Sequence, residues 1–238
     1  MTAPYPAPTF TGPRLEAAII DLDGTMIDTA DDFTASLNGM LAQLDAEETT
    51  REEVVGYVGK GSEHLIRSVL APRFEAEHAQ ARFDEAFAIY QAEYAQINGL
   101  HTRLYPDVEA GLRALRDAGL KLACVTNKPH RFALELLRQY RLAPYFSVVL
   151  GGDSLAKKKP DPLPMLTAAA QLGVEPSATV AIGDSENDAL AGRAAGMATL
   201  TVPYGYNHGQ AIQTIKSDGI VASLLDAAKA IAAHQSTT

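Results

Sequence analysis

Short apolar runs that each end in a polar or acidic cluster constrain the fold of this chain more than any other feature. We interpret these runs as buried strands at residues 17–20, 121–125, 147–150, 179–182 and 199–202. From residue 105 onward, apolar residues at helical spacing separate the runs and predict helices at about 106–119, 132–140, 162–172, 185–195 and 221–233. Strands that alternate with helices indicate an α/β fold with a parallel sheet and right-handed crossovers.

Residues 29–100 interrupt this alternation, because helical spacing continues there without a predicted strand. Four helices are expected, beginning near Thr29, Thr50, Ser62 and residue 76. The first two are predicted to begin with a capping box, which pairs Thr29 with Asp32 and Thr50 with Glu53. A helical block of this kind inside an α/β chain indicates an insertion into the sheet domain.

We therefore expect the chain to have three parts. A catalytic α/β core comprises residues 17–28 and 102–238, and a helical cap comprises residues 29–101. Residues 1–16 contain four prolines and few apolar residues, which predicts a flexible arm without a catalytic role. With 238 residues, of which 47% are hydrophobic, the chain can bury a sizeable core without disulfides.

The charge balance argues against several classes of partner. Twenty Lys and Arg residues against 29 Asp and Glu residues leave a formal net charge of −9, whereas binding to nucleic acid or to anionic membranes favours a basic face. No stretch reaches the ~20 apolar residues of a membrane span, and no signal-peptide pattern is present. The single cysteine, Cys124, is predicted to pack inside a strand. We expect a cytoplasmic protein, and no pattern predicts its oligomeric state.

Polar residues that can bind a metal ion or a phosphoryl group lie at or near the predicted strand ends. They are Asp21, Asp23, Thr126, Asn127, Lys159, Asp184 and Asp188. Because parallel strands end at the same edge of a sheet, we expect these residues to meet at one place. Carboxylates gathered in one site repel each other, and a divalent cation removes this repulsion. Oxygen ligands without His or Cys favour Mg²⁺ over zinc.

This set of groups is suited to phosphoryl transfer. Of the two carboxylates of Asp21 and Asp23, one can attack and the other can act as acid and base. Gly24 allows the backbone to approach an anion, and Lys159 supplies a positive charge. The pair Thr126-Asn127 offers hydrogen-bond donors to phosphoryl oxygens.

Four segments in this order resemble the motifs of the haloacid dehalogenase-like hydrolases. They are Asp21-Leu22-Asp23-Gly24-Thr25, Thr126-Asn127, Lys159-Pro160 and Gly183-Asp184-Ser185-Glu186-Asn187-Asp188. The resemblance covers residue 17 to about 235 and implies a Rossmann-like core in which the helical insertion is a C1 cap. Within this superfamily the chain resembles the phosphoglycolate phosphatases at the segments 56–61, 126–129, 159–162 and 204–207.

The resemblance implies a Mg²⁺-dependent phosphatase that hydrolyses the small molecule 2-phosphoglycolate to glycolate and phosphate. Asp21 is implied to form an aspartyl-phosphate, while Asp23 protonates the leaving group and then activates water. The resemblance places Mg²⁺ on the Asp21 carboxylate, the Asp23 backbone carbonyl and Asp184. It assigns Thr126-Asn127 and Lys159 to the phosphoryl group.

Several alternatives stay open. Asp188 can cap the helix that begins at Ser185, or it can contact the metal directly or through water. Gly59 and Lys60 can join two cap helices, or they can enter the mouth of the site with Lys60 facing a substrate carboxylate. The aromatic residues of the cap are expected to pack rather than to bind a ligand; they are Tyr57, Phe83, Phe87, Tyr90 and Tyr94.

The core motifs also fit a phosphatase for another small phosphoester or a sugar phosphomutase. A dehalogenase is disfavoured because its reaction needs neither the second aspartate nor a metal. A phosphonate hydrolase is disfavoured because it uses a cap lysine as a Schiff base and resembles this sequence less at Asp23. A non-catalytic relative is disfavoured by the presence of Asp21, Asp23, Lys159 and Asp184. Lys157, Lys158, His130 and His208 are expected to be loop or surface residues.

Overall fold

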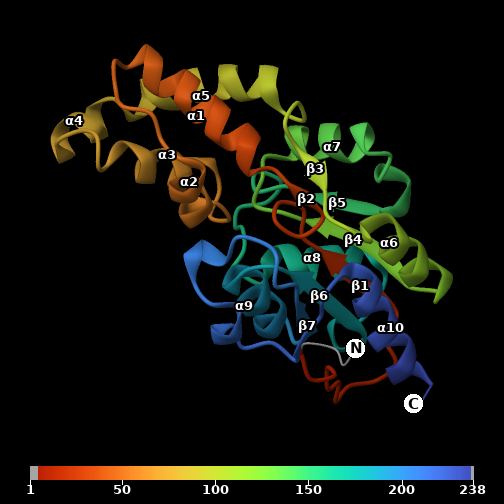
Figure 1. Ribbon diagram of the computed structural model, residues 1–238. Helices are drawn as coiled ribbons and strands as arrows, with labels where there is room; N and C mark the ends of the chain where they lie inside the picture. The colour runs from red at the N-terminus through yellow and green to blue at the C-terminus, as the bar shows by residue number, and fades with distance from the viewer. Residues whose placement is uncertain (1–4, 237–238) are drawn as a thin grey trace.

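The computed structural model describes residues 5–236, in which a parallel sheet lies between two layers of helices (Figure 1). The main sheet has the strand order β5-β4-β1-β6-β7-β8, and every neighbouring pair is parallel. Its strands are β1 (Ala17–Ile20), β4 (Lys121–Val125), β5 (Val148–Leu150), β6 (Thr179–Gly183), β7 (Ala198–Thr201) and β8 (Gly219–Ile220). The predicted α/β class and parallel sheet are confirmed, and β8 is an additional edge strand that the sequence analysis did not predict.

Helices cover both faces of this sheet, which explains why its strands are apolar on both sides. One face packs against α6 (Val108–Asp117), α7 (His130–Gln139) and α10 (Leu224–Gln235). The other packs against α8 (Leu163–Leu172) and α9 (Glu186–Ala194). In β1, Ala18 and Ile20 point to the first face, and Ala17 and Ile19 point to the second.

A group of helices is inserted between β2 (Ile27–Asp28) and β3 (Arg103–Leu104), two short strands that pair antiparallel. The inserted helices are α1 (Ala30–Gln43), α2 (Arg51–Tyr57), α3 (Ser62–Leu70), α4 (Ala76–Ala81) and α5 (Phe83–Ile97). Figure 1 shows them as a group beside the sheet, and they have a hydrophobic cluster of their own. We propose that residues 29–101 form the cap and that residues 17–28 and 102–238 form the core.

Two local expectations for the cap are wrong. The helix expected from about residue 76 is divided at Arg82 into α4 and α5. Thr29 precedes α1 without capping it, because its Oγ1 donates a hydrogen bond to Asp23 Oδ1 instead (2.8 Å). Asp32 accepts hydrogen bonds from the backbone N–H groups of Gly99 and His101 (2.5 and 2.7 Å). The second predicted capping box, Thr50 with Glu53, is confirmed.

The predicted arm, residues 1–16, lies partly outside the described residues. In its described part, the Thr9 N–H donates to the Asp218 carbonyl oxygen (3.1 Å), and Leu15 is buried in the cluster beneath the sheet. The predicted lack of a catalytic role for the arm stays a prediction. Among residues 5–236, no helix is both long and apolar enough to cross a membrane.

Candidate active site

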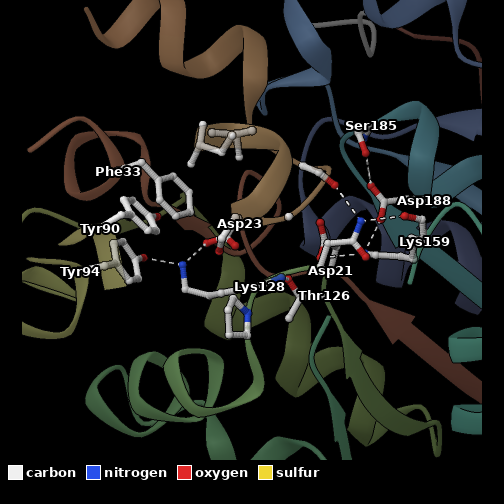
Figure 2. A pocket seen from close by; sticks show the side chains of 17 residues that line it. Asp21, Asp23, Phe33, Tyr90, Tyr94, Thr126, Lys128, Lys159, Ser185 and Asp188 are labelled. Carbon is white, nitrogen blue, oxygen red and sulfur yellow. Dashed lines mark hydrogen bonds and ion pairs between the residues drawn. The ribbon is translucent and has the colours of Figure 1, made fainter. Parts of the chain in front are cut away.

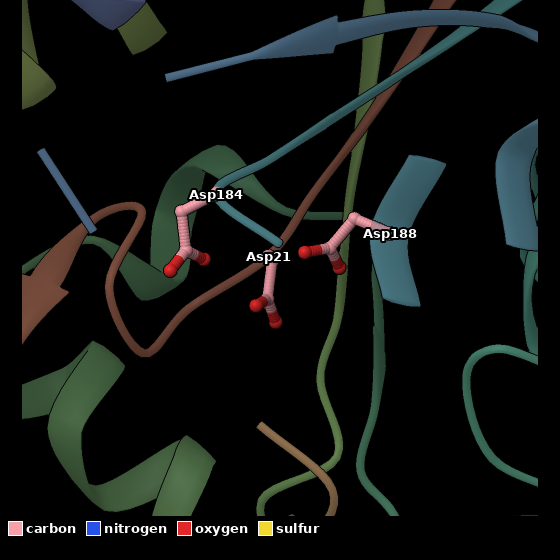
Figure 3. Close-up of side chains that lie close together, drawn as sticks. All are labelled: Asp21, Asp184 and Asp188. Atoms are coloured by element: carbon pink, nitrogen blue, oxygen red, sulfur yellow. The ribbon is translucent and has the colours of Figure 1, made fainter. Parts of the chain in front are cut away.

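Three carboxylates meet at the carboxyl edge of the sheet, as the sequence analysis predicted (Figure 3). Asp21 directly follows β1, Asp184 directly follows the neighbouring strand β6, and Asp188 lies in the first turn of α9. The register of the two strands pairs Ile20 with Ile182, and therefore brings the residues after them side by side. One oxygen from each carboxylate lies within 4.8 Å of the others.

Lys159 is the cation among these carboxylates. Its Nζ lies 2.8 Å from Asp21 Oδ1 and 2.6 Å from Asp188 Oδ1, and it donates to the Val125 carbonyl oxygen (2.7 Å). Burial alone would lower the pKa of Lys159, but the charges of Asp188 and Asp21 outweigh burial and raise it. The ammonium group is therefore firmly charged.

The carboxylates still carry an excess of negative charge, because three of them face one ammonium group. Burial raises the pKa of Asp21; the charge of Lys159 opposes this shift, and the charges of Asp188 and Asp184 add to it. Burial and the charge of Asp188 likewise raise the pKa of Asp184 to about 7. A divalent cation would remove this repulsion, and the all-oxygen donor set fits Mg²⁺.

The surrounding groups hold the two carboxylates of the β6–α9 segment in place. Asp184 accepts from Thr25 Oγ1 (2.9 Å) and from the Tyr206 N–H (2.7 Å). Asp188 Oδ2 accepts from both the N–H and the Oγ of Ser185 (3.1 and 2.7 Å). Asp188 therefore caps its helix and pairs with Lys159 at the same time, and its direct contact with a metal stays a prediction.

Asp23 lies apart from the carboxylate cluster and faces the cap (Figure 2). Its Oδ1 accepts from Thr29 Oγ1 (2.8 Å) and from Lys128 Nζ (3.0 Å). The Lys128 side chain is only 1% exposed, and its Nζ donates to the Tyr94 hydroxyl (2.5 Å). The same Nζ lies 4.4 and 4.8 Å from the ring centroids of Phe33 and Tyr94.

Lys128 was not predicted to be a site residue. It lies in the segment 126–129, which resembles the phosphatase motif, but no role was assigned to it from the sequence. The available signal was its position directly after Thr126-Asn127, at the carboxyl end of a predicted strand. Burial lowers the pKa of Lys128, and the charge of Asp23 opposes this shift.

The site opens into a small cavity of about 40 Å³ between the core and the cap. Asp21, Asp23, Thr126, Asn127 and Lys159 line it from the core. Apolar and aromatic residues line it from the cap; they are Phe33, Val58, Leu65, Tyr90 and Tyr94. All five aromatic residues expected to pack do so: Phe83, Tyr90 and Tyr94 are buried in the hydrophobic cluster of the cap, and Tyr57 and Phe87 pack against it. Tyr90 and Tyr94 line the cavity as well.

Some of the residues expected to bind substrate line the cavity, whereas others are exposed or are hydrogen-bonded to other parts of the chain. Asn127 Nδ2 donates to the carbonyl oxygens of Gly59 and Lys159 (2.8 Å each), so it ties the cap loop to the core. Gly59 lines the cavity, but Lys60 is exposed and lines a neighbouring hollow. The Gly24 N–H donates to the Ile27 carbonyl oxygen (2.9 Å), which leaves it unavailable to an anion.

The remaining expectations concern residues outside the catalytic cluster. Lys157 and Lys158 are exposed, as predicted. Cys124 is fully buried in β4, and burial raises the pKa of its thiol. His208 is partly buried, with Nε2 lying 3.3 Å from Asn187 Nδ2 near the cap loop. His130 begins α7 and is also partly buried.

Comparisons with known proteins agree with this architecture. The model of the haloacid dehalogenase-like hydrolase family matches residues 18–202. A phosphoglycolate phosphatase of Nitrosospira multiformis is 44% identical over 217 residues, which cover 91% of this chain and 96% of the relative. A phosphoglycolate phosphatase of Thiobacillus denitrificans is 42% identical, with 90% and 94% covered. The crystal structure of a predicted phosphoglycolate phosphatase from Haemophilus somnus matches with a TM-score of 0.85 at 30% identity and covers 91% of this chain and 98% of its own.

Proposed function

Because the chain belongs to the haloacid dehalogenase-like hydrolase family, we propose that it is a Mg²⁺-dependent phosphatase that hydrolyses 2-phosphoglycolate to glycolate and phosphate. The observation that carries the proposal is the cluster of Asp21, Asp184 and Asp188 beside Lys159, with Asp23 at the other side of the cavity between core and cap. Nucleophile, cation site and acid are thus gathered in one small space. We infer the identity of the substrate from the names of the relatives, which are phosphoglycolate phosphatases.

In this proposal Asp21 is the nucleophile. Its carboxylate attacks phosphorus, the bond from phosphorus to the ester oxygen breaks, and an aspartyl-phosphate forms. Lys159, at 2.8 Å from Asp21, and Thr126 hold the phosphoryl oxygens. A Mg²⁺ ion held by Asp21, Asp184 and the Asp23 backbone carbonyl would neutralise charge on the phosphoryl group.

Asp23 is the general acid and base. It gives its proton to the departing glycolate oxygen, and it then takes a proton from the water that hydrolyses the aspartyl-phosphate. The hydrogen bond from Thr29 and the ion pair with Lys128 hold this carboxylate toward the cavity. The aromatic wall of Phe33, Tyr90 and Tyr94 keeps bulk water away while the first bond breaks.

The cavity is lined by charged residues of the core and by apolar residues of the cap, so a substrate bound there contacts both parts. A phosphatase for another small phosphoester shares all these features, and substrate measurements separate it from the proposal.

The test is phosphate release from 2-phosphoglycolate, a hexose phosphate, a nucleoside monophosphate and pyrophosphate, with and without Mg²⁺. The proposal expects the highest kcat/KM for 2-phosphoglycolate, loss of activity on chelation and no need for a bisphosphate. If the activity depends on Mg²⁺ but another compound has the highest kcat/KM, the proposed substrate is wrong and the proposed phosphatase mechanism stands.

The assigned nucleophile has a test of its own. Asp21→Asn removes the attacking carboxylate and is expected to lower kcat by about 10⁴-fold or more, as for essential catalytic groups in other enzymes. The melting temperature of the variant, compared with that of the wild type, controls for misfolding. Activity within tenfold of the wild type would show that Asp21 is not the nucleophile.

A further inference from the structure

We propose that Lys128 binds the carboxylate of the substrate and thereby selects phosphoesters whose leaving group is acidic. The inference rests on the proposed function and deepens it, because it names the residue that distinguishes 2-phosphoglycolate from neutral phosphoesters. Lys128 stands on the far side of Asp23 from the carboxylate cluster (Figure 2).

The residues that line the cavity lie in a definite order from one end to the other. Asp21 and Lys159 hold one end, where phosphorus must lie for the attack. Asp23, which meets the ester oxygen, lies toward the other end, with Lys128 Nζ 3.0 Å from its Oδ1. In 2-phosphoglycolate a single methylene separates the ester oxygen from the carboxylate. A group bound to Asp23 is therefore within reach of that carboxylate.

The two lysines that line the cavity have different charged partners. Among the described residues that line it, Lys128 and Lys159 are the cations. Lys159 is paired with two carboxylates, Asp21 and Asp188, and belongs to the phosphoryl end. A second anionic group on the substrate needs a counter-charge at the opposite end. Lys128 is the lining cation placed there.

The ammonium group of Lys128 has an N–H donor that is not used by its described partners. An ammonium group has three N–H donors, and the described partners of Nζ are Asp23 Oδ1 and the Tyr94 hydroxyl. One donor is thus left for a ligand.

The cap completes this binding group. Phe33 in α1 and Tyr94 in α5 place their rings beside Nζ and keep water from it. In such a desolvated place a charged contact is stronger than at the surface. Because the lysine comes from the core and both rings come from the cap, the carboxylate is recognised only with the cap in place.

The test compares two substrates of equal length in Lys128→Met. These are 2-phosphoglycolate and 2-hydroxyethyl phosphate, which carries an uncharged hydroxymethyl group in place of the carboxylate. Removing the charge also disturbs Asp23, which both substrates need, so the readout is the ratio of their kcat/KM values. We expect this ratio to fall about 10- to 100-fold, the range for a lost hydrogen bond between charged groups. Lys229→Met, at an exposed lysine of α10, is the matched control and should leave the ratio unchanged.

Two further measurements guard against a folding defect. Inorganic phosphate should still inhibit Lys128→Met with its wild-type constant, because the phosphoryl end is intact. Tyr94→Phe removes the hydroxyl that holds Nζ and keeps the ring; it should lower the same ratio by a smaller factor, about 2- to 10-fold.

The outcomes separate this inference from the proposed function. If the wild type prefers 2-phosphoglycolate but Lys128→Met lowers both activities equally, the inference is overturned and the function stands. If Lys60→Met removes the preference instead, the exposed lysine of the cap loop binds the carboxylate, which is one of the two alternatives left open for Lys60 by the sequence, and the inference is again overturned. A wild-type enzyme without the preference would overturn the proposed substrate itself.

Discussion

Gly24 occupies a position at which only a hydrogen atom fits as a side chain. Its φ of +82° lies in the left-handed region, and a Cβ there would overlap the carboxylate of Asp184. Gly119 has a similar φ of +87° but no neighbouring atom within 4 Å of a Cβ. A comparison of alanine substitutions at Gly24 and Gly119 therefore distinguishes the effect of backbone strain from the effect of a steric clash in the site.

We expect Gly24→Ala and Gly119→Ala each to lose about 1 kcal/mol of unfolding free energy, because alanine is strained at positive φ. Gly24→Ala should in addition displace Asp184 and raise the Mg²⁺ concentration needed for half-maximal activity, whereas Gly119→Ala should leave it unchanged. Denaturant unfolding and a Mg²⁺ titration of activity measure the two effects. An unchanged Mg²⁺ requirement in Gly24→Ala would show that Asp184 does not bind the metal.

The elements of the cap are fixed by local hydrogen bonds as well as by packing. At the start of α2, Glu53 accepts from Thr49 Oγ1 (2.7 Å) and from Arg73 (2.9 Å), and it completes the capping box with Thr50. These hydrogen bonds lower the pKa of Glu53 to about 2, and the bond from Thr49 has a larger effect than the bond from Arg73. Since the ionised carboxylate is favoured in the fold, its stabilisation is present above the usual pKa of 4.5 and is lost as the pH falls toward 2.

Glu53→Gln should therefore lower the unfolding free energy at pH 7 by less than about 1 kcal/mol, since the side chain is 40% exposed and solvent screens its ion pair. The difference from the wild type should shrink between pH 4.5 and pH 2. Glu52→Gln, an exposed neighbour in the same turn, is the control. Denaturant unfolding over this pH range measures both, and a difference that persists at the lowest pH would contradict the assignment.

At the scale of the whole molecule, the metal site joins parts of the chain that are far apart in sequence. The cluster unites residues after β1 and β6 with the first turn of α9. Tyr206 extends the link to the cap: its N–H donates to Asp184, and its hydroxyl accepts from the N–H groups of Thr29 and Ala30 (2.7 and 3.0 Å). A metal bound here would stabilise the entire fold, because the unfolded chain cannot present these ligands together.

We expect Mg²⁺ at 100 times its dissociation constant to add about 2.7 kcal/mol of stability and to raise Tm by roughly 5–10 °C. Asp184→Asn should abolish this rise, and a chelator should reverse it in the wild type. Differential scanning calorimetry, with Na⁺ at equal ionic strength as the control, measures the shift. An equal rise in Asp184→Asn would place the ion elsewhere.

The alternation of strands and helices and the meeting of Asp21, Asp184 and Asp188 could be predicted from the residues alone. Apolar periodicity is a local property, and parallel strands must end at one edge, so these residues could not lie far apart. The position of Lys128 beside Asp23 became apparent only in the folded molecule. Lys128 and Asp23 are 105 positions apart, and their contact depends on cap helices closing over the sheet. The position of Lys128 after Thr126-Asn127 places it near the site, but the sequence does not show that it is buried beside Asp23 whereas Lys60 is exposed.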